Sequence, residues 1–403
     1  MALPVHGWFR FPAGFSAEWV RTVVHDHRGE LNGGTFLDPF SGVGTAVLAA
    51  EEAGVRSLGL EAQPFILRVA KAKLNWYERV EEFADFAERV LTAAKREPAH
   101  EPKYPRLIEK CYSEHAIRDL YSLKAAWERL ADYSAVSELA WLCLVSILRS
   151  CSHVGTAPWQ YVLPSQEKAI VARPYDAFAS QVNRMIMDMR IRQLQVAEPS
   201  AQIRLSDART CEGIEDQSVG LVVTSPPYAN NYDYADATRL EMTFLGEVLD
   251  WGDLHEKARK GLVRSCSQHV STEKTAIEDM LTQLNGIPFE GAIRTVCGQL
   301  AEERSNHGGK KQYDVLIAAY FADMLHVWQA LRRVCRKNAA VCFVVGDSAP
   351  YGVHVPVEEW MGQLAVCVGF KAYRFEKLRD RNTKWKNRKH RVPLQEGCLW
   401  VEG

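Results

Sequence analysis

The stretch TFLDPFSGVGTAVLAAEEAGVRSLGLEAQPF, residues 35–65, constrains the fold more than any other part of the chain. A short apolar run ends at Asp38, and the chain then turns through Gly42 and Gly44. An Ala-rich helical pattern follows and leads to a second short apolar run, which ends at Glu61. This order indicates a strand, a helix and a second strand that lies parallel to the first. Because a parallel pair needs helices on its faces, the sequence predicts a layered α/β protein.

Other apolar runs have the length and composition of strands in the same sheet. Hydrophobic residues make up 47% of the 403 residues and charged residues 25%, as in an ordinary globular protein with a large core. We predict parallel strands at 35–37, 57–60, 203–205, 221–224 and 340–345, and an antiparallel closing pair near 370–373 and 398–401. The expected fold is therefore a Rossmann-like, mostly parallel sheet with a terminal antiparallel pair.

Two segments break this alternation and are predicted to be largely helical insertions. The expected division is a core segment at 1–80, an insertion at 81–200, a core segment at 201–245, a second insertion at 246–312 and a final core segment at 313–403. Within the first insertion, residues 156–175 contain three prolines and are predicted to form an ordered loop between helices.

Acidic residues follow three of the predicted strands: Asp38, Glu61 and Asp207. Because the carboxyl ends of parallel strands meet at one edge of a sheet, we expect all three at one ligand site. Glu61 suits a ribose diol, and Asp207 suits an adenine amino group. The glycine turn lacks the third glycine of the dinucleotide fingerprint, and Asp38 would repel a pyrophosphate but attract a cationic amino group. These features favour S-adenosylmethionine over NAD, and a tight turn without any ligand is the alternative.

The fourth predicted strand ends abruptly in TSPPY, residues 224–228, and here the sequence resembles a known family. Ser225, Pro226, Pro227 and Tyr228 match the catalytic motif of the S-adenosylmethionine-dependent amino-methyltransferases of DNA. The segments FRFPAGFSAEWV (9–20), LDPFSGVGT (37–45) and VVGDS (344–348) resemble that family's N-terminal cofactor segment, glycine motif and a later core strand. The resemblance implies a methyltransferase fold with S-adenosylmethionine as cofactor. Together with the acids, the implied cofactor contacts are Phe11, Asp38, Phe40, Ser41, Gly42, Gly44, Thr45, Glu61 and Asp207.

The TSPPY turn suits methylation of an exocyclic amino group. Such a group is a poor nucleophile because its lone pair is delocalised into the ring, so hydrogen-bond acceptors must favour its pyramidal form. The resemblance implies that Ser225 and the Pro226 carbonyl are these acceptors, and that Tyr228 stacks on a base flipped out of the duplex. The Pro226–Pro227 pair fixes the backbone and so holds that carbonyl rigidly. Carbon-5 methylation needs a cysteine, typically behind a proline, and the chain has no Pro-Cys dipeptide.

Ser at the first motif position occurs mostly with N4-cytosine targets in this family, whereas Asp or Asn occurs mostly with N6-adenine. We therefore expect a DNA methyltransferase that makes N4-methylcytosine, with target recognition in one of the insertions and a cognate restriction endonuclease as a candidate partner. The alternatives are an N6-adenine DNA methyltransferase, an RNA guanine-N2 methyltransferase, a non-catalytic binding protein of the same fold and, more distantly, a Rossmann dehydrogenase.

Contacts to DNA are expected from a local basic segment. A net charge of -1 excludes a globally basic binder, but residues 371–391 carry ten Lys or Arg against Glu376 and Asp380. A solvated hairpin loop is the alternative interpretation of this segment. The predicted contacts are Tyr232 and Tyr234, beside the TSPPY turn, and Arg379, Arg381, Lys384 and Arg388 in the basic segment.

The remaining expectations are absences. The ten cysteines include no CxxC pair, so we expect reduced thiols and no metal site. The N-terminus lacks the apolar segment of a secretory leader, and the longest apolar run, Ala140 to Leu148, is too short to span a bilayer. A cytoplasmic protein is the simplest expectation.

Overall fold

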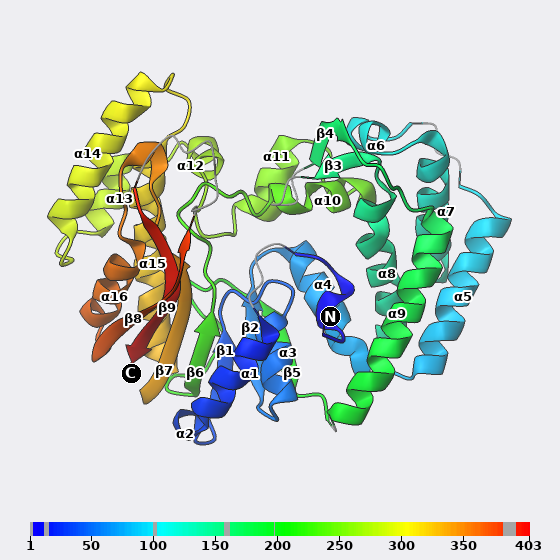
Figure 1. Cartoon of the computed structure of the whole chain (residues 1–403), viewed down its shortest axis with the longest axis horizontal. Coiled ribbons are helices and arrows are strands. Elements are labelled where there is room, and N and C mark those ends of the chain that lie inside the picture. Colours follow the sequence, from blue (N-terminus) through cyan, green and yellow to red (C-terminus); the bar gives the residue numbers. More distant parts are fainter. Residues whose placement is uncertain (1–2, 12–15, 100–102, 157–161, 197, 382–391) are drawn as a thin grey trace.

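A seven-stranded sheet forms the centre of the computed structural model, which describes residues 3–11, 16–99, 103–156, 162–196, 198–381 and 392–403. In spatial order the strands are β5 (Ala201–Leu205), β2 (Ser57–Glu61), β1 (Thr35–Asp38), β6 (Val219–Thr224), β7 (Cys335–Gly346), β9 (Leu394–Glu402) and β8 (Ala372–Arg381). β9 runs antiparallel to both of its neighbours, and the other pairs are parallel. The predicted α/β class and the Rossmann-like methyltransferase sheet with an antiparallel end are confirmed (Figure 1).

The differences from the predicted strands lie at strand ends. β7 begins earlier than expected, at Cys335. β8 begins after the predicted position 370, because Gly369, with φ of 105°, still belongs to the turn behind the preceding helix and Phe370 is buried. Most of β8 is exposed, so the strand has no alternating apolar pattern that would reveal its length.

Helices cover both faces of the sheet. On one face, α1 (Ala17–Asp26) and α3 (Thr45–Glu52) pack on side chains such as Phe36 and Leu221. On the other face, α15 (Tyr313–Val334) and α16 (Val357–Cys367) cover side chains such as Val222 and Val341. Successive residues of a strand point to opposite faces, so burial on both faces explains why the central strands are continuous apolar runs.

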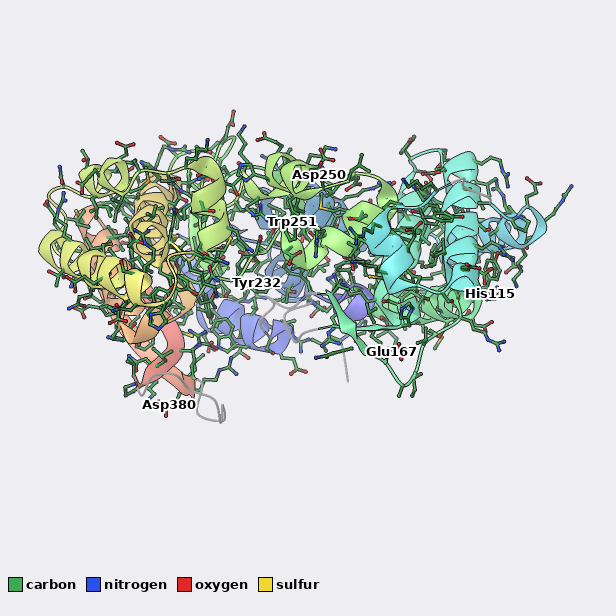
Figure 2. The ribbon with its side chains drawn as sticks, turned by 90° about the horizontal axis from the view of Figure 1, so that it is seen from above. His115, Glu167, Tyr232, Asp250, Trp251 and Asp380 are labelled. Carbon is green, nitrogen blue, oxygen red and sulfur yellow. The ribbon has the colours of Figure 1, made fainter. Side chains whose placement is uncertain are left out.

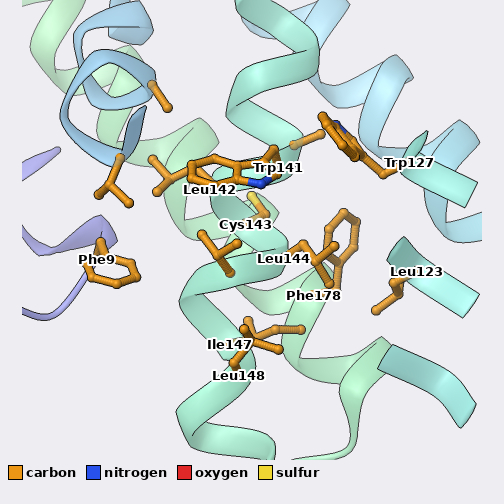
Figure 3. Packing of buried hydrophobic residues seen from close by; sticks show 14 of the residues in the cluster. Phe9, Leu123, Trp127, Trp141, Leu142, Cys143, Leu144, Ile147, Leu148 and Phe178 are labelled. Atoms are coloured by element: carbon orange, nitrogen blue, oxygen red, sulfur yellow. The ribbon is translucent and has the colours of Figure 1, made fainter. Parts of the chain in front are cut away.

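The first insertion forms a helical bundle that shares its core with the sheet lobe. Its helices are α5 (Val80–Arg96), α6 (Arg106–Cys111), α7 (Glu114–Leu130), α8 (Ala135–Cys151) and α9 (Pro174–Gln195). Trp141 of α8 packs against Phe65 of α4 (Pro64–Leu74), with ring centroids 5.9 Å apart, and Phe65 packs against Phe9 at 6.0 Å. Figure 3 shows Phe9 beside the buried residues of α8. One apolar core thus joins the N-terminal segment, α4 and the bundle.

The loop predicted at 156–175 is wrong in part, because β3 (Val154–Thr156) and β4 (Val162–Glu167) form an antiparallel hairpin. Pro164 argued against a strand, since proline cannot donate a ladder hydrogen bond. The hairpin accommodates it because the register shifts between the Val154–Glu167 pair and the Gly155–Leu163 pair, which leaves Pro164 within the irregularity.

The second insertion is also largely helical and packs mainly on α15. After α10 (Arg239–Leu245) come α11 (Trp251–Leu254), the π-helical turn η4 (His255–Arg259), α12 (Ser267–Glu273), α13 (Ile277–Gln283) and α14 (Glu290–Asn306). The remaining short elements are η1 (His6–Trp8), α2 (Arg28–Leu31), η2 (Asn75–Tyr77), η3 (Asp236–Thr238) and η5 (Pro350–Gly352). Across the described ranges, no helix combines the length and the apolar character needed to cross a membrane.

Candidate active site

The carboxyl ends of β1, β2, β5 and β6 open onto one pocket of about 850 Å³, part of which is open to solvent. Of the residues predicted from the sequence, its lining includes Phe11, Asp38, Phe40, Ser41, Gly42, Thr45, Glu61, Asp207, Ser225, Pro227 and Tyr234. Gly44, Pro226 and Tyr228 adjoin these residues in the chain but are not part of the lining. Residues from four strand ends, far apart in sequence, thus meet at one site.

The glycine turn is shaped by its backbone. Gly42 and Gly44 have φ values of 50° and 84°, in the left-handed region that other residues rarely adopt. A Cβ at Gly44 would also lie 3.0 Å from Cδ1 of Ile203. The backbone N–H and the hydroxyl of Ser41 both donate to the Leu60 carbonyl at 3.0 Å, which ties the turn to the end of β2.

Asp38 is a buried carboxyl at the pocket wall. Its Oδ1 accepts hydrogen bonds from the Thr224 hydroxyl at 2.6 Å and from the Phe40 N–H at 3.1 Å. Burial raises the pKa of Asp38 to about 7, although both hydrogen bonds act in the opposite direction. A cationic group in the pocket would therefore lower the pKa of Asp38 and form an ion pair with the resulting carboxylate.

Glu61 has the same electrostatic character. Its Oε1 accepts from the Gln63 N–H at 2.8 Å. Burial raises the pKa of Glu61 to about 7, with a smaller contribution from the nearby Asp38, while backbone N–H groups of Gln63 and Gly42 lower it. The buried Asp38 and the partly buried Glu61 share one pocket, which is an electrostatic cost to the unliganded protein that a ligand donating to them would reduce.

Asp207 lies in the same pocket but already has a partner. The Arg209 guanidinium donates to both of its carboxylate oxygens, with Nε 3.0 Å from Oδ1 and 2.8 Å from Oδ2. Arg209 also approaches Asp323 of α15 at 3.3 Å. The predicted adenine contact of Asp207 would thus have to share the carboxylate with Arg209.

Sequence reasoning missed one wall of the pocket, formed by Gly261, Leu262 and Val263 of the second insertion. Arg264 fixes this segment, because its Nε and Nη2 donate to the buried Asp323 at 3.0 and 2.5 Å. The sequence offered no signal for this wall, since an Arg–Asp pair 59 positions apart leaves no local pattern.

Lys73 of α4 was also missed. It is fully buried, and its Nζ donates to the Val43 carbonyl at 2.9 Å and to the His6 carbonyl at 3.2 Å. Lys73 thereby ties the glycine turn to the N-terminal segment that carries Phe11. Burial, with a smaller contribution from Arg192, lowers the pKa of Lys73 to about 7.

The TSPPY turn is held by the end of β7. The Ser225 hydroxyl donates to the Val344 carbonyl at 3.4 Å, and the Ser348 hydroxyl donates to the Ala229 carbonyl at 2.5 Å. Tyr228 is partly buried, and burial raises its pKa to about 12, so its phenol is neutral at physiological pH.

The two predicted contact tyrosines differ in exposure. Tyr234 lines the pocket, whereas Tyr232 is only 9% exposed and packs edge-on against Tyr234, with ring centroids 4.5 Å apart. In the view from above, Tyr232 lies near the middle of the molecule, with the sheet lobe on one side and the helical bundle on the other (Figure 2). Tyr232 is therefore placed to support Tyr234 more than to contact a ligand.

The predicted basic DNA contacts also differ in their surroundings. Arg379 is 70% exposed and pairs with Glu396 at 2.6 Å. Arg381 is turned inward, toward Tyr228. Lys384 and Arg388 lie outside the described residues. In the part of the chain that the structure describes, no cluster of three or more His, Cys, Asp or Glu residues is suited to a metal ion.

The sheet order and the pocket at its carboxyl edge define a Rossmann-like methyltransferase fold. The chain is 24% identical to the Type II methyltransferase M.BsoBI of Geobacillus stearothermophilus, over 94% of this chain and 81% of that protein. It is 23% identical to the Type II methyltransferases M.AvaI of Nostoc sp. and of Anabaena variabilis, over 91% of this chain and 79% of those proteins. No family model and no solved structure matches the chain. The alignment with M.BsoBI covers 94% of this chain and so includes most of both insertions. The similarity to methyltransferases therefore extends beyond the sheet-forming segments.

Proposed function

We propose that this protein is a site-specific DNA methyltransferase that transfers a methyl group from S-adenosylmethionine to the exocyclic N4 of cytosine. The observation that carries the proposal is the single pocket in which Asp38, Glu61 and the glycine turn meet Ser225 and Pro227 of the TSPPY turn. Similarity to Type II methyltransferases along most of the chain supports the methylation chemistry.

The pocket residues fit S-adenosylmethionine. We assign its cationic amino group to Asp38 and its ribose diol to Glu61, because both are carboxyls of the pocket wall with pKa values near 7 that gain a partner on ionising. Asp207 is assigned to the adenine amino group, but its pairing with Arg209 predicts a smaller share of the affinity than that of Glu61. Phe11 and the Phe40 to Thr45 backbone complete the assigned contacts. When bound, the cofactor supplies a methyl group on a cationic sulfur, which is already activated for direct displacement.

The TSPPY residues are assigned to the target amino group. Ser225 donates its hydroxyl proton to the Val344 carbonyl and also interacts with the Tyr228 phenol, and a remaining lone pair of its oxygen is the proposed acceptor for that amino group. The Pro226 carbonyl is the second proposed acceptor, and Tyr228 is the proposed stacking surface for the flipped base. Direct displacement needs no covalent enzyme intermediate, so these side chains would act by orientation.

DNA recognition is assigned to the two insertions, and phosphate contacts to the basic segment at 371–391. The helical bundle and the α12–α14 part of the second insertion lie on opposite sides of the β1–β6 region (Figure 1). A cognate restriction endonuclease is included as a proposed partner because the relatives are Type II methyltransferases.

Nucleoside mass spectrometry tests the chemistry. Methylation-free DNA is incubated with the purified protein and isotopically labelled S-adenosylmethionine, and labelled N4-methylcytosine is the expected product. Asp38→Asn protein, purified in the same way, is the control for contaminating activities. Labelled N6-methyladenine would overturn the assignment to cytosine, and label in RNA alone would overturn the assignment to DNA. Cofactor binding without any methylated product would favour a non-catalytic protein of this fold.

A further inference from the structure

Arg381 contacts the tyrosine of the TSPPY turn. It is the last residue of β8, directly before residues 382–391, and its side chain is only 16% exposed. Its guanidinium lies over the Tyr228 ring, with the central carbon 5.2 Å from the ring centroid. A cation over an aromatic face is attracted by the ring quadrupole. Although the sequence places Arg381 in a basic segment, its geometry differs from that of an exposed phosphate contact.

Polar contacts fix the guanidinium in this place. Nη1 donates to the Asp347 carbonyl at 2.7 Å, and Nε lies 3.6 Å from Oε2 of Glu396. A Cβ at Gly346 would lie 2.8 Å from Nη1, so glycine at the end of β7 leaves the room that Arg381 occupies. The side chain therefore bridges β7, β9 and Tyr228.

We propose that Arg381 is a positioning residue, which holds the Tyr228 ring against the end of β7 so that its other face is presented to the target base. This inference rests on the function proposed above. The hydrogen bonds from Ser225 and Ser348 fix the backbone on either side of the turn, and the Ser225 side chain interacts with the Tyr228 phenol, whereas Arg381 lies over the ring itself.

Arg374 provides a matched control on the same strand. Its guanidinium lies over the Trp400 ring, with the central carbon 5.3 Å from the centroid, and its side chain is 62% exposed. Arg374→Met therefore removes a cation from an aromatic ring of β9, whereas Arg381→Met removes one from the TSPPY turn.

The test measures cofactor affinity, DNA affinity at several salt concentrations and the single-turnover methylation rate at saturating DNA. For Arg381→Met we expect cofactor affinity within about twofold of the parent, an unchanged slope of log K against log salt, and a rate about tenfold lower. Arg381→Lys, which keeps a cation near the ring, should recover part of this rate. Arg374→Met should keep the rate within about twofold.

Two results would overturn the inference while the parent methylates DNA. One is a rate for Arg381→Met no lower than that for Arg374→Met. The other is a salt slope reduced by about one at an unchanged rate, which would make Arg381 a phosphate contact. If Arg381→Met does not bind cofactor, Arg381→Lys is tested in its place. A methylation rate equal to that of the parent, together with a salt slope reduced by about one, would then also make Arg381 a phosphate contact. A parent that methylates no DNA would instead overturn the proposed function.

Discussion

Replacing Asp38 by asparagine should make the unliganded protein more stable and remove cofactor binding. Asparagine has nearly the same shape, and its carbonyl oxygen can still accept from the Thr224 hydroxyl and the Phe40 N–H. What disappears is the buried negative charge. Because that charge is the group proposed to hold the cationic end of the cofactor, stability and function should change in opposite directions.

The magnitude and its sign follow from the pKa of Asp38. Each pKa unit corresponds to about 1.4 kcal/mol. A folded-state pKa of about 7, instead of the ordinary 3.8, therefore costs up to about 4 kcal/mol once the group is ionised. Since the folded-state pKa is the higher one, the protonated Asp38 favours the folded state; its contribution to stability is fully present below pH 3.8 and is lost as the pH rises through about 7. The stability gained by Asp38→Asn should grow from acid pH up to about pH 7 and then level off.

Urea unfolding of both proteins at several pH values, without cofactor, measures this difference. Addition of S-adenosylmethionine at about 100 times its Kd should stabilise the parent by about 2.7 kcal/mol and leave Asp38→Asn unchanged. Asp207→Asn is the control, because its carboxylate is paired with Arg209, and this variant should gain no stability at pH 8. A variant at position 38 that is no more stable than the parent at pH 8 would refute the argument that burial destabilises the charge.

Three further predictions use the same site. The pKa of about 7 at Glu61 predicts that cofactor binding tightens as the pH rises from 6 to 8, and calorimetry in buffers of different ionisation enthalpy should detect the released protons; pH-independent binding would contradict it. Ser225→Ala should lower the methylation rate more than cofactor affinity, because its proposed hydrogen bond matters most as the amino nitrogen becomes pyramidal, and equal losses would count against that role. Joint neutralisation of Arg379, Lys384 and Arg388 should weaken DNA binding and flatten its salt dependence by about one in slope per lost contact, whereas an unchanged slope would leave 371–391 as a solvated loop.

The parts of the site that the sequence predicts are those fixed by strand order. Asp38 and Glu61 end β1 and β2 and Asp207 follows β5, and parallel strands bring their carboxyl ends to one edge whatever lies between them. The glycine turn is equally predictable from the sequence, because Gly42 and Gly44 adopt a backbone conformation that few other residues tolerate. Ser225 and Pro227 then reach the same pocket because β6 lies next to β1.

The parts that the sequence did not predict depend on distant pairs of side chains. A charged residue in a basic segment is ordinarily solvent-exposed, so the inward position of Arg381 follows only from the spatial order of β7, β9 and β8. Lys73 has no sequence signal either, because the His6 and Val43 carbonyls that its Nζ contacts lie 67 and 30 positions away in the chain. Long-range polar contacts of this kind have no sequence period.

Residues 62–200 separate two adjacent strands of the sheet, and a single buried acid explains how the sheet tolerates them. Glu51 of α3 accepts from Arg192 of α9 at 2.7 Å, from the Trp76 indole at 3.0 Å and from the Ser200 N–H at 2.8 Å. Glu51 therefore ties the segment after α4, the end of α9 and the entry to β5 together, and removing Arg192 would leave a buried charge uncompensated at a cost of several kcal/mol. Because α3 begins directly after Gly44 and carries Glu51 near its end, one short helix joins the bundle to the glycine turn. Any DNA contact made by the bundle is thus made by a body joined to the proposed cofactor site.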